Sequence, residues 1–259
     1  MDDIFELVKS RHSVRSYTDK PIDGNVKEEL ENIIEKCNNA GKLNIKLFLN
    51  EPKAFDTFMA HYGKFNNVKN YIVLKGDKSK NLEERCGYFG QEIVMKAQEL
   101  GLNTCWVAMT YGKRKVPYKL SEKEKIVCTL AIGYGTENGV SHNIKTFEDV
   151  SIKKENFPDW YKKGIEFALL APTAMNQQKF SFELTKENKV KAEAKKDFIR
   201  RLTWELQSII LSWARKKKIL NGQINFYTNY KTPSVILFFG HCGLHNILYK
   251  ILILCYTLE

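Results

Sequence analysis

The sequence predicts an α+β fold, and three observations support this prediction. Segments with the helical period are intermixed along the chain with short alternating or continuously apolar segments, which are typical of strands. Hydrophobic residues make up 43% of the 259 residues and aromatic residues 12%, which allows one sizeable core or two smaller ones. Residues 33–49 and 164–184 share the order helix, polar turn and strand, which suggests a faint internal repeat.

In the first part of the chain, hydrophobic spacing predicts helices and strands in turn. Residues 2–10 predict a short helix with its apolar side chains on one face and acidic residues that can cap its N-terminus. Residues 25–39 predict a second, longer amphipathic helix. Residues 44–49 alternate as in a half-buried strand. Residues 52–61 favour a helix with a proline in its first turn, and the apolar run 71–75 is typical of a buried strand.

The middle of the chain predicts the longest helix, over residues 82–100, with a buried stripe on one face and a glycine at its C-terminal cap. An apolar run follows at 105–109, and residues 126–132 form a near-continuous apolar strand. Residues 158–170 predict a further amphipathic helix, and residues 179–184 alternate as a strand.

The formal net charge of +11 would suit a nucleic acid, a membrane surface or an anionic ligand as partner. No nucleic-acid-binding motif is present, so a bound anion is the simpler interpretation. The six cysteines form no Cys-x-x-Cys pair, so neither a zinc site nor a redox dithiol is indicated. Because the acidic start lacks a signal-peptide pattern, we expect a cytoplasmic protein with reduced thiols.

A basic loop follows the first predicted helix. Arg11, His12 and Arg15 are potential cations, and Ser13 adds a hydroxyl within the same five residues. A phosphate monoester needs clustered donors of this kind, and the fork of an arginine suits its oxygens. On composition alone, a solvated basic loop remains the better interpretation.

A second candidate segment covers residues 171–178, Ala-Pro-Thr-Ala-Met-Asn-Gln-Gln, between a predicted helix and a predicted strand. It combines a helix-ending proline, a hydroxyl and side-chain amides. Amides both donate and accept hydrogen bonds, which suits the ribityl hydroxyls and pyrimidine edge of a flavin. Taken alone, this segment is better interpreted as an ordinary helix-to-strand turn.

Together these segments resemble the nitroreductase-like flavin oxidoreductases. The pattern Arg-His-Ser-Val-Arg-x-Tyr, followed by Lys-Pro-Ile, is similar to their N-terminal FMN-phosphate segment, and residues 171–178 are similar to their second flavin-contacting segment. Residues 90–107, which end in Leu-Gly-Leu-Asn-Thr-Cys-Trp-Val, resemble their central helix and the strand-like segment beside the flavin ring. Residues 130–134 resemble the strand that follows. The matches keep a consistent order from residue 4 to about 185.

The resemblance implies a nitroreductase-like fold, an antiparallel or mixed sheet flanked by helices, with bound FMN. It assigns the phosphate to the basic loop, the reactive edge of the ring to two backbone N–H groups, and closure of the site to the late segment. Lys145 is a weaker phosphate candidate. No side chain is expected as acid or base, because the flavin carries the chemistry. The implied FMN-binding residues are Arg11, His12, Ser13, Arg15, Val107, Ala108, Lys145, Pro172, Thr173, Ala174, Asn176 and Gln178.

One departure from the family pattern bears on how the site is built. In ordinary members, the Ala-Pro-Ser/Thr segment follows soon after the basic loop, whereas here residues 37–41 lack it and it occurs only at residue 171. This arrangement resembles a nitroreductase subfamily in which one chain mimics the usual dimer. We therefore expect a pseudo-dimer of two halves with one flavin site inside the chain, and a monomer or loose dimer.

The resemblance ends near Lys196. We expect residues 1–196 to form the FMN-binding domain without its last helix, and residues 197–259 to be an unrelated, poorly ordered or loosely packed tail. That tail carries eight Lys/Arg and three Asp/Glu. Its apolar end, residues 247–258, is interrupted by Lys250, whereas a membrane span needs about 20 largely apolar residues. A membrane anchor is therefore the weaker interpretation.

A one-base deletion near residues 195–197 explains the tail better. Moving the reading frame of the tail by one base forces a glycine at Trp204–Glu205 and another at Trp213–Ala214. AT-rich codons then allow a peptide beginning Tyr-Thr-Lys-Ile-Asp-Leu-Gly-Ile-Ala-Lys-Tyr-His-Phe-Glu-Leu-Gly, and a stop at Ile224–Asn225. This peptide resembles the C-terminal helix of the same subfamily, and it would pair with residues 90–101 as the second copy of the repeat.

The leading functional hypothesis is an FMN-dependent oxidoreductase that passes electrons from NADH or NADPH to a nitroaromatic, a quinone or a similar small acceptor. A flavin-binding protein without turnover, an inactive frameshifted product and a basic nucleic-acid binder are the alternatives. His61 and His142 are lone histidines in the sequence, and we expect a structural role for each.

Overall fold

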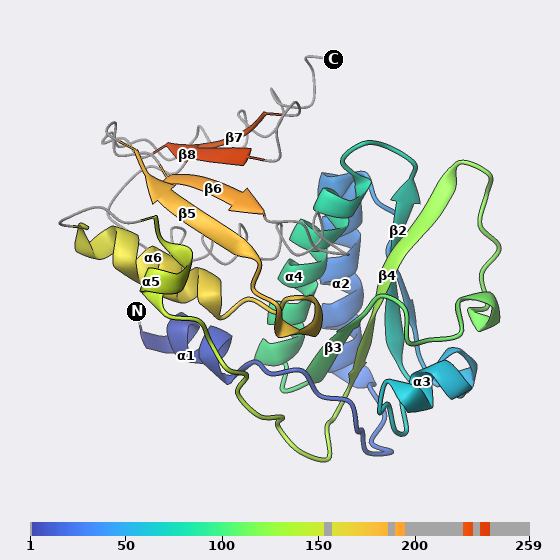
Figure 1. The fold of residues 1–259 in the computed structure, drawn as a ribbon. Coiled ribbons are helices and arrows are strands. Elements are labelled where there is room, and N and C mark those ends of the chain that lie inside the picture. The colour runs from blue at the N-terminus through green and yellow to red at the C-terminus, as the bar shows by residue number, and fades with distance from the viewer. Residues whose placement is uncertain (1, 153–156, 186–189, 195–224, 230–233, 239–259) are drawn as a thin grey trace.

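The computed structural model describes residues 2–152, 157–185, 190–194, 225–229 and 234–238 (Figure 1). These residues form helices and two antiparallel four-stranded sheets, which confirms the predicted α+β class. The helices are α1 (Asp2–Ser10), α2 (Gly24–Gly41), α3 (Phe58–Tyr62), α4 (Leu82–Glu99), α5 (Phe147–Val150) and α6 (Asp159–Leu169), with short 3-10 turns η1 (Pro52–Ala54), η2 (Lys113–Lys115) and η3 (Ala174–Asn176). The strands are β1 (Lys46–Phe48), β2 (Tyr71–Asp77), β3 (Asn103–Val107), β4 (Glu124–Gly133), β5 (Phe180–Leu184), β6 (Val190–Ala194), β7 (Asn225–Asn229) and β8 (Ser234–Phe238).

The first sheet has the strand order β1-β2-β4-β3, so β2 and β4 are its central strands. Successive side chains of a strand point to opposite faces. Ile72 and Leu74 belong to the core formed with α2 and α4, whereas Tyr71 and Val73 belong to a core on the other face. Burial on both faces explains why β2 is an uninterrupted apolar run in the sequence. Helices α2 and α4 lie side by side along the sheet (Figure 1).

The second part of the described chain builds its own core. Helix α6 and strand β5 contribute Tyr161, Phe167 and Phe182, which are almost fully buried. Val8 of α1 and Met95 of α4 belong to the same core. The N-terminal helix and the central helix therefore join the two parts, and the basic loop, which follows α1 directly, begins at that junction.

The segment predicted as one helix over residues 52–61 is instead two short pieces. Pro52 opens the turn η1, and α3 begins only at Phe58. The Thr57 hydroxyl accepts a hydrogen bond from the backbone N–H of Ala60 at 3.2 Å, which makes Thr57 the cap of a new helix. The prediction of a continuous helix was wrong. The hydrophobic period over residues 52–61 is weak, and Thr57 starts a new helix by capping it.

Several elements were not predicted. Helix α5 has only four residues and is held by a capping box between Thr146 and Asp149, which leaves no hydrophobic period to detect. Strands β7 and β8 lie in the tail, where β8 pairs with β6 and β7 pairs with β8. The other residues of the tail lie outside the described residues, so its predicted frameshifted origin and loose packing stay predictions.

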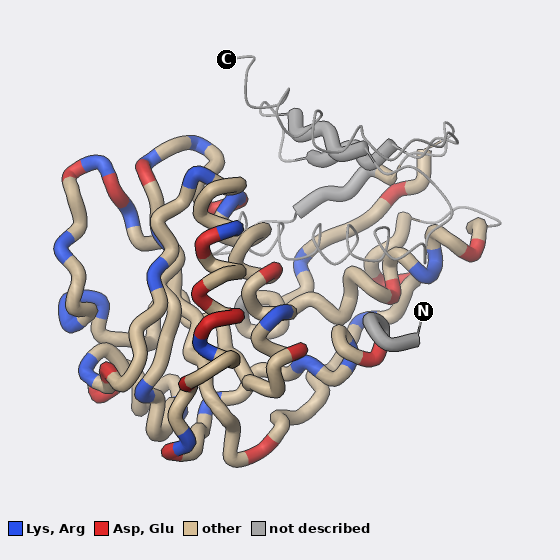
Figure 2. Tube along the Cα trace, turned by 180° about the vertical axis from the view of Figure 1, so that it is seen from behind, with Lys and Arg blue, Asp and Glu red and all other residues tan. Residues whose placement is uncertain are grey.

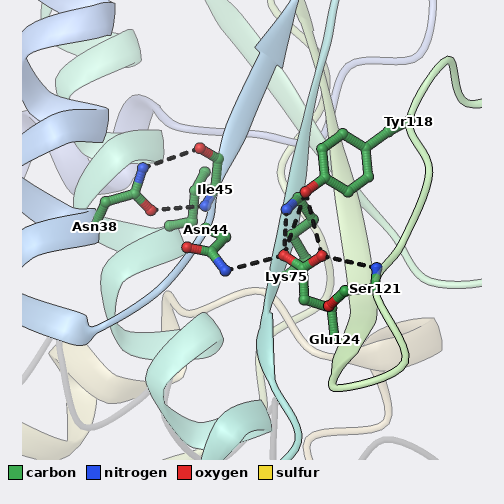
Figure 3. A network of polar contacts seen from close by, with 7 residues as sticks. All are labelled: Asn38, Asn44, Ile45, Lys75, Tyr118, Ser121 and Glu124. Atoms are coloured by element: carbon green, nitrogen blue, oxygen red, sulfur yellow. Dashed lines mark hydrogen bonds and ion pairs between the residues drawn. The ribbon is translucent and has the colours of Figure 1, made fainter.

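A buried ion pair joins the two central strands at the end of the first sheet (Figure 3). Lys75 Nζ lies 2.7 Å from Glu124 Oε1, and the side chains are 3% and 7% exposed. The carboxylate also accepts from Asn44 Nδ2 at 2.9 Å, from Tyr118 at 3.2 Å and from the backbone N–H of Ser121 at 3.1 Å. The hydrogen bond from Lys75 is the largest cause that lowers the pKa of Glu124 to about 2, and the bonds from Ser121 and Asn44 add to it.

Charged residues of both signs are spread along the described part of the chain. Figure 2 shows basic and acidic segments interleaved along the same tube, rather than separated by sign. Among the described residues, no helix is both long and apolar enough to cross a bilayer.

Candidate functional site

The basic loop is held against the edge strand of the first sheet. The backbone N–H of Val14 donates to the Thr104 carbonyl at 3.0 Å, and Ser13 and Thr104 form a parallel bridge. The Tyr17 hydroxyl folds back to donate to the Val14 carbonyl at 2.7 Å. Strand β3 is at the edge of the sheet order, so its free backbone edge is available to fix the loop.

Arg11 is a buried cation without a counter-ion among the described residues. It is only 3% exposed, and its Nε has no hydrogen-bond partner. Burial lowers the pKa of the guanidinium to about 10. A buried charge is normally paired, because desolvation is costly unless an opposite charge compensates it. The loop therefore holds a donor that a bound anion would satisfy.

The other three predicted phosphate ligands point to different neighbours. Ser13 hydrogen-bonds the buried thiol of Cys105, and the charge of Arg11 helps to lower the pKa of His12. Arg15 is exposed, and its guanidinium lies 5.9 Å from the centre of the Phe65 ring. Arg11 and His12 are thus clustered, whereas Arg15 lies at the outer side of the loop.

A connecting segment, residues 139–145, packs against the basic loop. Gly139 has φ +73°, and a Cβ at this position would lie 2.9 Å from His12 Cβ and 3.2 Å from the Ser13 carbonyl. This approach requires glycine in both conformation and space. In the same segment, His142 hydrogen-bonds the backbone of Leu169, while its buried Nε2 has no partner.

The connecting segment also binds the late segment, residues 171–178. Gln178 is 3% exposed and is the centre of this contact. Its Oε1 accepts from the backbone N–H of Lys145 at 2.9 Å, and its Nε2 donates to the Asn143 carbonyl at 2.8 Å and to Asn176 Oδ1 at 2.9 Å. Lys145 Nζ donates to the Gln178 carbonyl at 2.8 Å, and the Gln178 N–H donates to the Thr173 hydroxyl at 3.1 Å.

The backbone of the late segment is strained. Met175, Asn176 and Gln178 have φ values of 51°, 54° and 45°, in the left-handed region that non-glycine residues rarely adopt. Such residues persist where surrounding contacts hold them, and they are common at ligand sites. Here the hydrogen bonds of Gln178 supply those contacts, while Met175 remains 79% exposed.

Val107 and Ala108, the predicted ring-edge residues, lie at and just after the end of the strand that fixes the basic loop. Val107 is buried at the last position of β3, and its carbonyl accepts from the Thr129 hydroxyl at 3.1 Å. Ala108 is half-buried directly after the strand. Both residues therefore lie close in sequence to Thr104, which forms the bridge with Ser13.

The structure brings together two of the predicted groups through residues 139–145, of which only Lys145 was among the predicted ligands. Arg11 and His12 meet the connecting segment at one end, and Thr173, Asn176 and Gln178 meet it at the other. Pro172 is half-buried beside Thr173, and Ala174 begins η3.

Two further residues of these segments have a buried polar atom without a partner and were not among the predicted ligands. His142 is not isolated, since His12 and Arg11 lie within electrostatic range of it. Gln177 presents a buried Oε1 without a partner. Only one feature of the sequence could have indicated His142 as a ligand, namely its position after β4 and three residues before Lys145.

The unpartnered polar atoms describe the ligand that this site would accept. Arg11 Nε calls for an acceptor such as an anion, and Gln177 Oε1 calls for a hydrogen-bond donor. His142 Nε2 can donate to an anion only when the imidazole is protonated. All three are buried. A molecule with a phosphate at one end and N–H or hydroxyl groups along its length has this chemistry.

Comparisons with known proteins agree on the family and the fold. The family described as "Putative TM nitroreductase" matches residues 3–209. A solved structure of a putative nitroreductase from Thermotoga maritima is similar with a TM-score of 0.63 and 20% identity, over 90% of this chain and 92% of that one. No curated protein matches the chain.

Two further solved structures are similar over a smaller share of this chain. An FMN-dependent nitroreductase from Clostridium difficile has 21% identity and a TM-score of 0.47, over 59% of this chain and 99% of that one. A putative nitroreductase in complex with FMN from Desulfovibrio desulfuricans has 19% identity and a TM-score of 0.48, over 60% and 98%.

Proposed function

The chain belongs to this nitroreductase family, and from this premise we propose that it is a cytoplasmic FMN-dependent oxidoreductase with one flavin site formed by two parts of one chain. The observation that carries the proposal is Arg11, a buried guanidinium with an unpartnered Nε and no counter-ion among the described residues. The phosphate of FMN supplies the missing anion, and the oxidoreductase family supplies the reason to expect a flavin.

The phosphate is assigned to the basic loop. Arg11 and His12 provide the inner donors, Ser13 a hydroxyl, and Arg15 an outer, exposed charge. Arginine suits this role because its fork can donate to two oxygens at once. Lys145 keeps its ammonium on the Gln178 carbonyl at 2.8 Å, so in this conformation it positions the late segment and leaves the phosphate to the loop.

We assign the flavin ring to the end of strand β3 and the rest of the flavin to the late segment. The backbone N–H groups of Val107 and Ala108 face the reactive edge of the ring in this proposal. Thr173, Asn176 and the free Oε1 of Gln177 offer polar groups for the ribityl chain and pyrimidine edge. Gln178 uses its amide within the protein and therefore holds the segment in place.

The chemistry supplied by bound FMN is the transfer of two electrons from NADH or NADPH to a small acceptor such as a nitroaromatic or a quinone. The protein binds the phosphate, orients the ring and excludes water. A buried, rigid strand and a strained, hydrogen-bonded turn suit this positioning role.

The binding test uses the 259-residue chain and two ligands. We expect purified protein to carry or take up FMN, visible as the flavin absorbance band, at one flavin per chain. Arg11→Ala should weaken FMN binding by about tenfold or more, because a charge-assisted hydrogen bond is lost, and Arg15→Ala by less. Riboflavin, which lacks the phosphate, should bind all variants similarly.

The matched control is Arg114→Ala, which removes an exposed cation in η2. It should leave FMN binding unchanged. If Arg11→Ala binds FMN as tightly as the wild type, the assignment of the FMN phosphate to Arg11 is wrong. Oxidation of NADH or NADPH by the loaded protein then separates an enzyme from a flavin-binding protein without turnover.

A further inference from the structure

We propose that His142 is an additional ligand of the FMN phosphate and that it takes up a proton when the phosphate binds. This inference rests on the proposed function, and it concerns a residue outside the family pattern that the sequence shows. The buried Nε2 of His142 has no hydrogen-bond partner.

The position of His142 matches that of a phosphate ligand. It lies in the connecting segment, three residues after Gly139, which packs on His12 and Ser13. The charge of Arg11 acts on both His142 and His12, so these three groups share one electrostatic site. The next residue, Asn143, accepts hydrogen bonds from Asn176 and Gln178 through its carbonyl, which fixes the backbone that carries the imidazole.

The hydrogen bond to Leu169 determines which ring nitrogen is available. This bond favours the protonated form, so the ring donates to the Leu169 carbonyl. Because Nε2 has no partner, we assign this bond, and the proton of the neutral ring, to Nδ1. A neutral His142 therefore presents a lone pair at Nε2, and a protonated His142 presents an N–H there. Only the protonated form can donate to a phosphate oxygen.

The groups around His142 keep it neutral until an anion arrives. Arg11 and His12 face it from the basic loop, Leu169 from the end of α6, and Lys145 on its own segment is bound to Gln178. Burial is the largest cause that lowers the pKa of His142, and the Arg11 charge adds to it. The same two causes lower the pKa of His12, and His142 adds to them.

A bound phosphate reverses this balance. Its two negative charges favour the imidazolium, so the pKa of His142 rises on binding, and the proton comes from solvent. Proton uptake then means that FMN affinity falls as pH rises above neutrality, by at most tenfold per pH unit for each proton taken up. Below about pH 6 the phosphate itself becomes protonated, and affinity falls for that separate reason.

Calorimetric titration of the full chain with FMN at pH 7.5, in two buffers of different ionisation enthalpy, measures the proton uptake directly. We expect uptake with FMN and none with riboflavin, which has no phosphate. His142→Gln should lower the uptake by at least half and weaken FMN binding at pH 6.5 by about tenfold, while riboflavin affinity stays the same. His142→Lys should restore FMN affinity and remove its decline at alkaline pH.

The control variant is His61→Gln, an exposed histidine of α3, whose binding and proton uptake should equal those of the wild type. Equal uptake with FMN and riboflavin, or a His142→Gln variant that behaves like wild type, overturns the inference and leaves the proposed function standing. Absence of any flavin binding overturns both. If His142→Gln does not fold, His142→Lys decides, because its FMN affinity should not decline at alkaline pH. A decline equal to that of the wild type overturns the inference.

Discussion

Two neighbouring glutamines in the late segment have opposite surroundings. Gln178 is buried with its amide fully used, and it links the late segment to the connecting segment. Gln177 has a buried Oε1 without a partner. Loss of a buried hydrogen-bonding group costs about 1–3 kcal/mol, whereas loss of an unsatisfied one costs little.

We therefore predict that Gln178→Ala lowers the free energy of unfolding by about 2–3 kcal/mol. It should also weaken FMN binding, because the left-handed backbone around it loses its support. Gln177→Ala is the matched control, and its stability should stay within about 0.5 kcal/mol of wild type. Urea unfolding of the three proteins measures their stability, and titration with FMN measures binding. Equal stability of the two variants would contradict the role given to Gln178.

At the scale of elements, the close approach of α4 to β3 depends on one glycine. A Cβ on Gly90 would lie 2.6 Å from Trp106 Cη2 and 2.7 Å from Leu74 Cδ1. Trp106 also donates from Nε1 to Gln91 Oε1 at 3.3 Å. The central helix, the core and the strand that fixes the basic loop therefore meet at this position.

We predict that Gly90→Ala destabilises the protein by about 1–3 kcal/mol, although alanine is the better helix former by about 1 kcal/mol. The methyl group must displace either the indole or the Leu74 side chain. Glu99→Ala, an exposed substitution in the same helix, is the control and should change little. Thermal unfolding checks this prediction, and a higher melting temperature for Gly90→Ala would show that the helix packs less closely than the structure indicates.

The ion pair between β2 and β4 makes the stability of the first sheet depend on pH. The folded-state pKa of Glu124 lies below its ordinary value of 4.5, at about 2. A carboxylate with a depressed pKa contributes stability that is fully present above pH 4.5 and is lost as the pH falls toward 2. Protonation of Glu124 and of other paired carboxylates therefore lowers the free energy of unfolding as the pH falls.

We predict that Glu124→Gln costs about 3–5 kcal/mol at pH 7, because Lys75 is left buried without its counter-charge. The variant should also lose less stability than wild type between pH 5 and pH 3. The double variant with Lys75→Met and Glu124→Leu should recover much of the loss, since an apolar pair of similar volume can replace a buried ion pair. Urea unfolding at the two pH values provides the measurement.

At the scale of the whole molecule, the tail after Lys196 is the main open prediction. We propose that it results from a one-base deletion near residues 195–197. Restoring one base should yield the amphipathic helix peptide and a stop at Ile224–Asn225, and sequencing of the gene checks this directly. If the restored frame gives neither, the proposal is wrong.

The restored chain should also behave differently. It would lack the described strands β7 and β8 and gain a helix that packs with α4 as the second copy of the repeat. A missing core helix can account for much of the usual stability of about 5–15 kcal/mol. We therefore expect the restored chain to show more helix by circular dichroism, a higher melting temperature and tighter FMN binding than the 259-residue chain.

Most of the fold could be predicted because its elements have regular hydrophobic periods. Helices α2, α4 and α6 have clear apolar faces, and Leu30 and Ile93 on those faces are almost fully buried. Elements held by a few polar contacts were missed, such as α5 with its capping box. The break at Thr57 was missed for the same reason, because a single capping hydroxyl leaves almost no trace in periodicity.

The sequence by itself determined the family resemblance, the α+β class and two candidate segments, because motifs and hydrophobic periods are local properties of the chain. Only the tertiary structure decided how those segments are joined. The connecting segment, residues 139–145, reaches Arg11 and His12 at one end and Gln178 at the other. His142 became a candidate ligand in the same way, since the lack of a partner for a buried atom depends on every residue folded around it.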